Sequence, residues 1–456
     1  METTALQQTN KTLKLAYPVI LGQLAQMFLG IIDMAMVGAV GYKELAAAAL
    51  VNSVINIPFV LGMGITISVS QLVSMANGQR NGPLVSHYLF NGFILSGVTA
   101  IIIALGLALG KNVLFHMGQD PEVAELAAPY LQLVSWSIIP MMLFMALKQF
   151  TDGLEYTKTA MIISLSAIPI NFLLNWVLIF GHFGFPRLEL VGAGIGTLIS
   201  RIIIFIALLA VVLKHKIFRR YIIIGKRQWF LYKKTWKDLL HIGIPSSLQV
   251  GMESGAFAVS AILIGTIGAR EQAAHQIAIS VVALTFMVSM GLSQAGSIRV
   301  SNTFGRKDFP LLRLIGKTTF ITALIYGAVC AGLIFLLKDH IPFIFTDDLS
   351  VIEIAISLLL LAGIFQISDS TQAVSAGLLR GIKDVKIPTI YIAIAYWAVG
   401  LPVGSLLTFY FDMGAAGIWV GFIVGLTISA ILLSLRFKNI TKNKNLKSRH
   451  PAKNRV

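Results

Sequence analysis

The sequence predicts an all-α membrane protein of twelve transmembrane helices, arranged in two six-helix lobes that are related by a parallel internal repeat. Its 456 residues are 56% hydrophobic and only 12% charged, with a mean hydropathy of +0.81, unlike water-soluble globular domains. Apolar runs of about 20 residues, the length that crosses a bilayer core as a helix, recur along the chain. The third observation is a persistent self-similarity between the two halves.

The first six apolar runs are separated by short polar joints that carry most of the charge. No cleavable signal is expected before the first run, because METTALQQTN has no basic residue and the run is too long for a signal core. The expected spans are Leu13–Val37, Ala46–Met75, Tyr88–Leu109, Glu122–Leu147, Thr159–Phe180 and Val191–Leu213.

The second half repeats this arrangement, with expected spans Leu239–Ile264, Ala273–Val300, Leu312–Leu337, Ile352–Leu378, Ile387–Tyr410 and Ala415–Phe437. An offset of 227 residues aligns the halves without gaps, from Pro18 on Pro245 to Gly78 on Gly305. Because six is an even number, both halves have the same orientation in the membrane. Parallel repeats of this kind are typical of two-lobed transporters that open a central cavity to either side in turn.

Four segments are expected from this pattern: an N-terminal lobe (1–214), a basic linker (215–237), a C-terminal lobe (238–438) and a basic tail (439–456). The linker interleaves cations with aromatic residues such as Trp229 and Trp236, which in isolation would fit single-stranded nucleic acid. Beside membrane spans the same pattern predicts anchoring at the bilayer interface. No nucleic-acid partner is therefore expected.

The basic residues also predict the orientation of the chain. Of the 36 Lys and Arg residues, five lie in odd-numbered joints and Arg201 lies within a span. The others lie in even-numbered joints, at the adjoining helix ends or in the termini. The positive-inside rule therefore places both termini in the cytoplasm. The odd-numbered joints hold Lys43, Lys111, Arg187, Arg270 and Lys338.

The sequence contains no phosphate-binding GxxxxGK[ST] motif, so ATP hydrolysis by this chain is not expected and energy must come from elsewhere. An intramembrane enzyme is one alternative class. Its candidate ligands or bases are scattered and form no HExxH or Ser–His signature: His87, His116, His182, His241 and His275. Neither a cofactor nor enzymatic activity is expected. A further alternative is a non-transporting receptor or scaffold, but it would give no role to the three buried acids described in the next paragraph.

Three acids lie deep within spans: Asp33, Glu253 and Asp369. A charge at that depth costs at least ~2.5 kcal/mol, so it normally serves a bound cation, a proton or a partner. The structural alternative is a permanent ion pair with Arg201 or Arg299. Carboxylates supply hard oxygen ligands for sodium and can also take up and release a proton, and the sequence leaves this choice open.

Polar and aromatic residues accompany each acid at helical spacing. Asp33 shares a stripe with Gln23, Gln26 and Gly30, and Asn171 and Asn175 stand one turn apart in the fifth span. The other candidate residues of a substrate cavity are Gln249 and Phe257 beside Glu253, Phe286 in the eighth span, and Phe365, Gln366 and Gln372 beside Asp369.

These residues carry a resemblance to a known family. The segments PVILGQLAQMFLGIIDMAMVG, INFLLNWVLIFGHFG, GMESGAF and QISDSTQAVSAGLLRGIKD resemble the multidrug and toxic compound extrusion (MATE) family, and especially its bacterial NorM branch. The resemblance implies a pump with a central cavity that exports large, often cationic and aromatic compounds, driven by inward flow of Na⁺ or H⁺. A monomer in the bacterial inner membrane is expected. The alternative is a flippase of related fold for lipid-linked oligosaccharides, which would need buried arginines facing pyrophosphate.

The resemblance also implies roles for individual residues. Glu253 and Asp369 match carboxylates that bind the coupling cation, for which sodium is one candidate, and Asp348 resembles an outer-loop acid that contacts substrate. Where some members place a tyrosine hydroxyl, the aromatic residues expected near this site are Phe257, Phe286 and Phe365, which offer only ring faces. The matching N-lobe cation site consists of Asp33, Asn171, Asn175 and Thr197.

Overall fold

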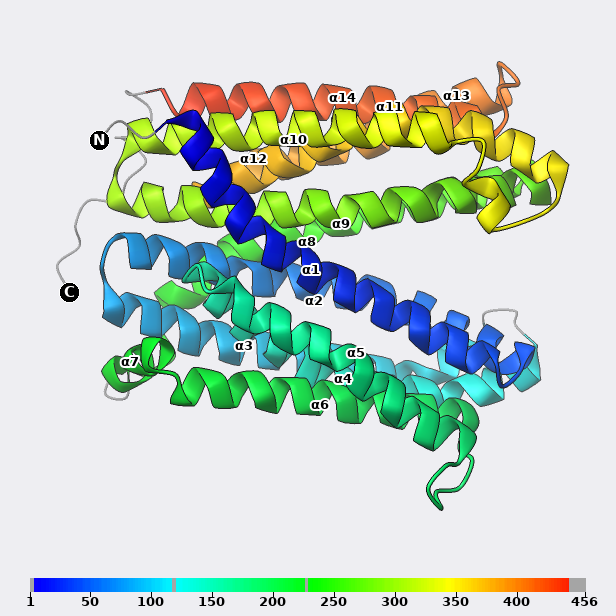
Figure 1. Ribbon diagram of the computed structural model, residues 1–456, viewed down its shortest axis with the longest axis horizontal. Helices are drawn as coiled ribbons and strands as arrows, with labels where there is room; N and C mark the ends of the chain where they lie inside the picture. Colours follow the sequence, from blue (N-terminus) through cyan, green and yellow to red (C-terminus); the bar gives the residue numbers. More distant parts are fainter. Residues whose placement is uncertain (1–3, 117–119, 226–228, 443–456) are drawn as a thin grey trace. The chain divides into compact units, whose positions relative to one another are not determined.

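A computed structural model of the chain describes residues 4–116, 120–225 and 229–442. Among these residues, twelve helices are long and apolar enough to cross a membrane, which confirms the predicted fold class. The elements run α1 (Ala5–Gly38), α2 (Tyr42–Gly78), α3 (Gly82–Leu109), η1 (Gly110–His116), α4 (Pro121–Gly153), α5 (Thr157–Phe180), α6 (Glu189–Lys214), α7 (Lys216–Gly225), α8 (Lys233–Gly265), α9 (Ala269–Arg306), α10 (Phe309–Leu337), η2 (Pro342–Ile344), α11 (Leu349–Gly381), α12 (Lys386–Ala393), η3 (Ile394–Gly400), α13 (Leu401–Phe409) and α14 (Ala415–Ile440) (Figure 1).

The chain forms two compact units. The N-terminal unit consists of Leu21–Ser247, and the C-terminal unit consists of Met1–Ile20 together with Leu248–Val456. Helices α1 and α8 each contribute to both units, and each changes unit shortly after a proline, Pro18 or Pro245. These units differ from the expected lobes in where the chain is divided, because the first turns of α1 pack with the second half of the sequence.

Helix boundaries follow the sequence repeat. Helix α2 begins at Tyr42 and α9 at Ala269, 227 residues later, and α6 and α14 each have 26 residues. The helix caps also recur. Asn81 accepts a hydrogen bond from the third residue beyond it, as Asp308 does in the second half, and each cap is followed by a proline in the first turn.

One helix lies at the centre of each unit. Helix α4 packs against α2, α3 and α6, and its counterpart α11 packs against α9, α10 and α14 (Figure 1). Glycines allow the closest approach. A Cβ at Gly153 would lie 2.7 Å from the Ser70 carbonyl oxygen, and a Cβ at Gly381 would lie 2.8 Å from that of Ser297. Backbone therefore packs directly on backbone at the same place in both halves.

The helix that contains the expected first span, Leu13–Val37, begins before that span. Helix α1 starts at Ala5, eight residues before Leu13, and its first turns are polar. Arg299 of α9 donates hydrogen bonds to the Gln8 carbonyl oxygen (2.7 Å), to Thr12 Oγ1 (2.5 Å) and to Gln8 Oε1. Tertiary hydrogen bonds, rather than apolar burial, hold this segment in place.

The basic linker is more structured than its composition indicates. It contains α7, which buries Phe218 and Tyr221. Beyond it, Trp229 Nε1 donates to Ser86 Oγ at 3.1 Å and Trp236 Nε1 donates to Asn91 Oδ1 at 3.0 Å. These two tryptophans, expected at the membrane interface, are thus also bound to α3.

Candidate cation and substrate sites

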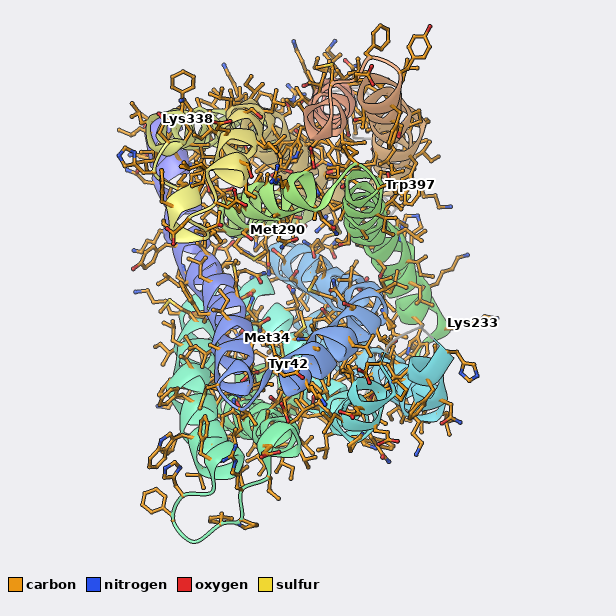
Figure 2. All side chains as sticks on the ribbon, turned by 90° about the vertical axis from the view of Figure 1, so that its right-hand side faces the viewer. Met34, Tyr42, Lys233, Met290, Lys338 and Trp397 are labelled. Carbon is orange, nitrogen blue, oxygen red and sulfur yellow. The ribbon has the colours of Figure 1, made fainter. Side chains whose placement is uncertain are left out.

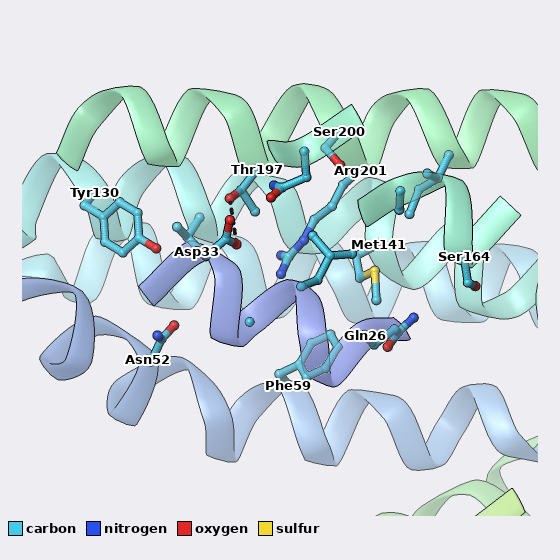
Figure 3. A pocket seen from close by; sticks show the side chains of 16 residues that line it. Gln26, Asp33, Asn52, Phe59, Tyr130, Met141, Ser164, Thr197, Ser200 and Arg201 are labelled. Atoms are coloured by element: carbon cyan, nitrogen blue, oxygen red, sulfur yellow. Dashed lines mark hydrogen bonds between the residues drawn. The ribbon is translucent and has the colours of Figure 1, made fainter. Parts of the chain in front are cut away.

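Asp33 is held by neutral polar groups of two neighbouring helices. Asn175 Nδ2 donates to Asp33 Oδ1 at 2.6 Å and to Asn171 Oδ1 at 3.3 Å. Thr197 Oγ1 donates to Asp33 Oδ2 at 3.4 Å (Figure 3). Asn171 and Asn175 lie one turn apart on α5. Gly196 lets α6 approach them, since a Cβ there would lie 2.3 Å from Asn175 Oδ1. The structure therefore brings together all four predicted N-lobe residues.

Arg201 lies beside Asp33, one turn beyond Thr197 on α6 (Figure 3). Its Nη1 donates to Ser137 Oγ at 2.7 Å. Within the described residues, no Lys or Arg nitrogen lies within 4.0 Å of the Asp33 carboxylate. Arg299 binds the start of α1 instead. Within the described residues, the structure therefore contains no direct ion pair between Asp33 and either Arg201 or Arg299.

Asp33 and Arg201 line a cavity of about 220 Å³ within the N-terminal unit (Figure 3). Five helices surround it: α1, α2, α4, α5 and α6. Gln26 and Gly30, which the sequence places on the Asp33 stripe, line it too, whereas Gln23 is not among its lining residues. The remaining lining residues are Leu29, Asn52, Phe59, Tyr130, Val134, Met141, Ser164, Ala167, Asn171, Thr197, Ser200 and Ile204.

The C-terminal unit holds the other two acids. Tyr396 donates its hydroxyl hydrogen to Glu253 Oε1 at 3.1 Å, and Asp369 is 1% exposed. Asp369 Oδ2 and the nearby Gln366 Oε1 are buried without a hydrogen-bond partner among the described residues. No Lys or Arg nitrogen of that part of the chain lies within 4.0 Å of either acid.

Tyr396 corrects an expectation. The sequence predicted that only phenylalanine rings would lie near these acids, but a fully buried tyrosine hydroxyl contacts Glu253. Tyr396 belongs to η3, a π-helical segment in the eleventh span. The next residue, Trp397, is labelled in Figure 2. Its Nε1 donates to the Met252 carbonyl oxygen at 3.1 Å. The apolar run IAYWAVG gave no signal apart from the presence of a tyrosine within a span.

Aromatic rings surround this acidic site. The Phe257 ring packs against the rings of Phe365, Tyr396 and Phe422, with centroid separations of 6.1, 6.2 and 5.0 Å. Gln366 Nε2 donates to Thr285 Oγ1 at 2.6 Å, next to the predicted Phe286, which is partly buried. The predicted phenylalanines 257 and 365 therefore lie together.

Other predicted residues lie elsewhere. Gln249 Nε2 donates to Thr389 Oγ1 at 2.9 Å at the start of α12, and Gln372 is buried in α11. Asp348 caps the N-terminus of α11, as Asp120 caps α4. Hydrogen bonds from the Ser350 hydroxyl and backbone hold the pKa of the exposed Asp348 below its usual value, so it remains ionised. The hydrogen bonds that the Asp348 carboxylate accepts in the structure come from Ser350.

A family model described as MatE matches residues 18–177 and 245–406 of this chain. The chain belongs to the MATE family. The two matches begin 227 residues apart, at the offset of the internal repeat, so the family unit occurs once in each half. As a MATE family member the protein is a membrane transporter and not an enzyme.

Curated relatives and solved structures agree with this assignment. The chain is 36% identical to a probable multidrug resistance protein NorM of Mesorhizobium japonicum, over 94% of each chain. It is 33% identical to the multidrug resistance protein NorM of Photobacterium profundum, over 95% of each chain. Its fold matches an outward-facing multidrug resistance MATE family transporter with a TM-score of 0.88 at 20% identity, over 97% of each chain.

Proposed function

We propose that this MATE transporter is an antiporter that exports large, often cationic and aromatic compounds and is driven by inward movement of Na⁺ or H⁺. The observation that carries the proposal is the acidic site of Glu253 and Asp369. A carboxylate within a membrane span requires a compensating positive charge or a proton. Here the surrounding protein supplies a tyrosine hydroxyl to Glu253 and no basic group within 4.0 Å to either acid, among the described residues.

The available ligand atoms fit both cations. Asp369 Oδ2 and Gln366 Oε1 are buried acceptors without donors in the described chain, and sodium prefers such oxygen ligands. A proton on one carboxylate would remove its charge and give it a hydrogen to donate. The aromatic rings around Phe257 offer faces to an organic cation. Asp33, Asn171, Asn175 and Thr197 form the second proposed cation site.

Coupling follows if ion and substrate favour different states of an alternating-access cycle. Each ligand shifts the equilibrium only by its difference in affinity for the two states. An inward ion gradient then drives substrate outward. No resident cofactor takes part in this scheme, because the coupling ion is itself transported.

We also place the protein as a monomer in the bacterial inner membrane, with both termini in the cytoplasm. The asymmetric distribution of Lys and Arg supports this orientation. Light scattering in detergent would measure the oligomeric state. Labelling of single cysteines introduced into the joints would measure the orientation, and labelling of odd-numbered joints from the cytoplasmic side would contradict it.

The test uses purified protein in proteoliposomes with ethidium as the substrate. Transport is measured with an imposed sodium gradient and, separately, with an imposed proton gradient. At least one gradient should drive ethidium uphill, and Glu253→Gln and Asp369→Asn should each reduce the rate about tenfold or more, since a buried charge-assisted contact is worth about 1.5–3 kcal/mol.

Asp120→Asn is the matched control, because Asp120 caps a helix outside the spans and asparagine caps equally well. This variant should transport normally. Equal gradient-driven transport by folded Glu253→Gln, Asp369→Asn and wild-type protein would overturn the proposal, as would uphill transport that neither gradient drives.

A further inference from the structure

Thr285 of α9 joins three helices of the C-terminal unit, α9, α10 and α11, which pack against one another (Figure 1). Gln366 of α11 donates from Nε2 to Thr285 Oγ1 at 2.6 Å. Tyr326 of α10 donates its hydroxyl hydrogen to the Thr285 carbonyl oxygen at 2.8 Å. The proposed ion cycle gives no role to the Thr285 hydroxyl, although its partner Gln366 lies three residues before Asp369.

The Thr285 hydroxyl acts as an acceptor toward Gln366 because its own hydrogen is used within α9. Thr285 Oγ1 donates to the Val282 carbonyl oxygen at 2.9 Å and lies 3.2 Å from the Val281 carbonyl oxygen. A threonine hydroxyl has one hydrogen and two lone pairs, so a lone pair remains for Gln366. An acceptor binds the NH₂ end of an amide and not its oxygen. Thr285 therefore fixes which end of the Gln366 amide faces α9.

The other end of the Gln366 amide is consequently its oxygen. Gln366 is fully buried, and its Oε1 has no hydrogen-bond partner among the described residues. Asp369 Oδ2 is also buried without a partner in that part of the chain. Residues three apart lie on one face of a helix. One face of α11 thus holds two buried oxygens, one charged and one neutral, that have no donor there.

The N-terminal unit has no counterpart of this arrangement. The offset of 227 places Pro58 at the position of Thr285, and proline has no hydroxyl group. The matching close contacts of Gly153 and Gly381 place Ile138 at the position of Gln366. The contact between Thr285 and Gln366 is therefore not part of the shared framework. It occurs only in the unit that contains two buried acids within its spans.

We propose that Thr285 is a positioning residue of the cation site: it turns the side-chain oxygen of Gln366 away from α9, where that oxygen serves with Asp369 as a ligand for sodium. Sodium needs several oxygen ligands, and an amide oxygen is one that proteins supply. A proton needs only a carboxylate oxygen. The inference rests on the proposed function and takes sodium as the ion of this site.

The test measures binding of radioactive sodium to purified protein in detergent, without substrate and without any gradient. Thr285→Val removes the hydroxyl but keeps the backbone carbonyl that Tyr326 binds. Sodium binding should weaken about tenfold, because the Gln366 amide is no longer held with its oxygen toward the ion. Thr285→Ser retains the hydroxyl and should bind sodium within about twofold of the wild type.

Thr322→Val is the matched control. Thr322 of α10 is partly buried, and in the described chain its hydroxyl bonds to the Thr318 carbonyl oxygen of its own helix. This variant loses a threonine hydroxyl at a comparable depth without affecting Gln366, so it should bind sodium as the wild type does. Equal sodium binding by Thr285→Val and the wild type would overturn the inference.

A double-mutant cycle tests whether Thr285 acts through Gln366. Gln366→Met fills similar space without an oxygen and should weaken sodium binding at least as much as Thr285→Val. Adding Thr285→Val to Gln366→Met should weaken it no further, because the amide that Thr285 orients is gone. Additive losses would overturn the inference. If Thr285→Val does not fold, Gln366→Met decides, and wild-type sodium binding in that variant would overturn the inference as well.

Transport separates a sodium ligand from a hydrogen-bond partner of a protonated Asp369. Where a proton gradient drives ethidium in sodium-free proteoliposomes, Thr285→Val should transport as the wild type does. Slower proton-driven transport with unchanged sodium binding would overturn the inference.

The same measurements separate the inference from the proposed function. If the wild type binds no sodium but a proton gradient drives ethidium uphill, antiport stands and the role of Thr285 fails. If sodium binding depends on Thr285 but neither gradient drives ethidium, antiport fails and the role of Thr285 stands.

Discussion

The carboxylates of Asp33, Glu253 and Asp369 share one property at the level of single residues: no charged side chain donates a hydrogen bond to them within the described chain. The buried Asp152 and Asp384 differ, because they are paired with Lys148 and Arg436. Asp33 accepts from Asn175 and Thr197, Glu253 accepts from Tyr396, and Asp369 Oδ2 has no donor among the described residues. Neutral donors orient a carboxylate without cancelling its charge. Each acid therefore keeps the capacity to bind a mobile cation or a proton.

Tyr396→Phe tests how much the orientation of Glu253 matters. The change removes one hydroxyl and with it the hydrogen bond to Glu253 Oε1. A hydrogen bond to a charged group is worth about 1.5–3 kcal/mol, so we expect the ion concentration for half-maximal ethidium transport to change about tenfold or more. The measurement is the transport rate as a function of sodium concentration or of pH.

Tyr410→Phe is the control, because Tyr410 is 76% exposed at the end of α13. It should leave the ion dependence unchanged. If Tyr396→Phe shows the wild-type ion dependence, Tyr396 only fills space in the aromatic cluster around Phe257.

Sequence reasoning found the three acids and the partners of Asp33, but it missed Tyr396, the partner of Glu253, for a physical reason. A charged residue in an apolar span stands out because its burial is costly, so Asp33, Glu253 and Asp369 can be recognised from the sequence alone. Tyr396 is amphipathic and common in spans, and its contact with Glu253 depends on how α8 and the eleventh span pack. Arg201 was visible as a charge, but its contact with Ser137 was not.

At the level of elements, the first turns of α1 depend on one arginine. Arg299 is 8% exposed and binds Gln8 and Thr12, which are 2% and 0% exposed. Arg299→Met would leave those polar groups buried without their donor. We expect Ala5–Thr12 to lose protection in hydrogen–deuterium exchange by about tenfold or more, since an unsatisfied buried group costs about 1–3 kcal/mol.

Arg306→Met provides the comparison, because Arg306 is exposed in the last turn of α9. Protection of α1 should remain at the wild-type level in this variant. Unchanged exchange of residues 5–12 in Arg299→Met would show that other contacts hold the start of α1.

The central helices of the two units depend on small residues. In Gly381→Ala the new methyl group would lie 2.8 Å from the Ser297 carbonyl oxygen, and backbone cannot move away cheaply. Overpacking of this kind costs about 1–3 kcal/mol, so the midpoint of thermal unfolding in detergent should fall by several degrees.

Gly332→Ala is the matched control, since a Cβ at Gly332 meets nothing within 4 Å. Alanine has the higher helix propensity, so this variant should be at least as stable as the wild type. A Gly381→Ala variant as stable as Gly332→Ala would contradict the close approach of α11 and α9.

Element boundaries show where the sequence is informative and where it is not. Hydropathy located all twelve spans because each must cover the apolar core of a bilayer. It did not predict the polar first turns of α1, which lie before the expected span and accept hydrogen bonds from Arg299. It also treated 215–237 as a linker, whereas α7 forms an amphipathic helix that buries Phe218.

At the level of the whole molecule, the repeat preserves the arrangement of helices but does not repeat the acidic residues of the candidate sites. The offset of 227 places Glu253 on Gln26 and Asp33 on Ser260. Each unit thus has an acid where the other has a neutral residue. The N-terminal unit adds Arg201 and a cavity, and the C-terminal unit adds a second acid and Tyr396. The two halves therefore supply different chemistry on one duplicated architecture.

The most direct test of the central claim runs the pump backwards. Binding free energies are reciprocal, so a substrate gradient should move the coupling ion if the ion gradient moves substrate. Proteoliposomes are loaded with ethidium without any imposed ion gradient, and internal sodium and pH are recorded. The account predicts a counterflow of sodium or protons in the wild type that is lost in Asp369→Asn. Ethidium movement without any counterflow, or the same counterflow in Asp369→Asn, would contradict it.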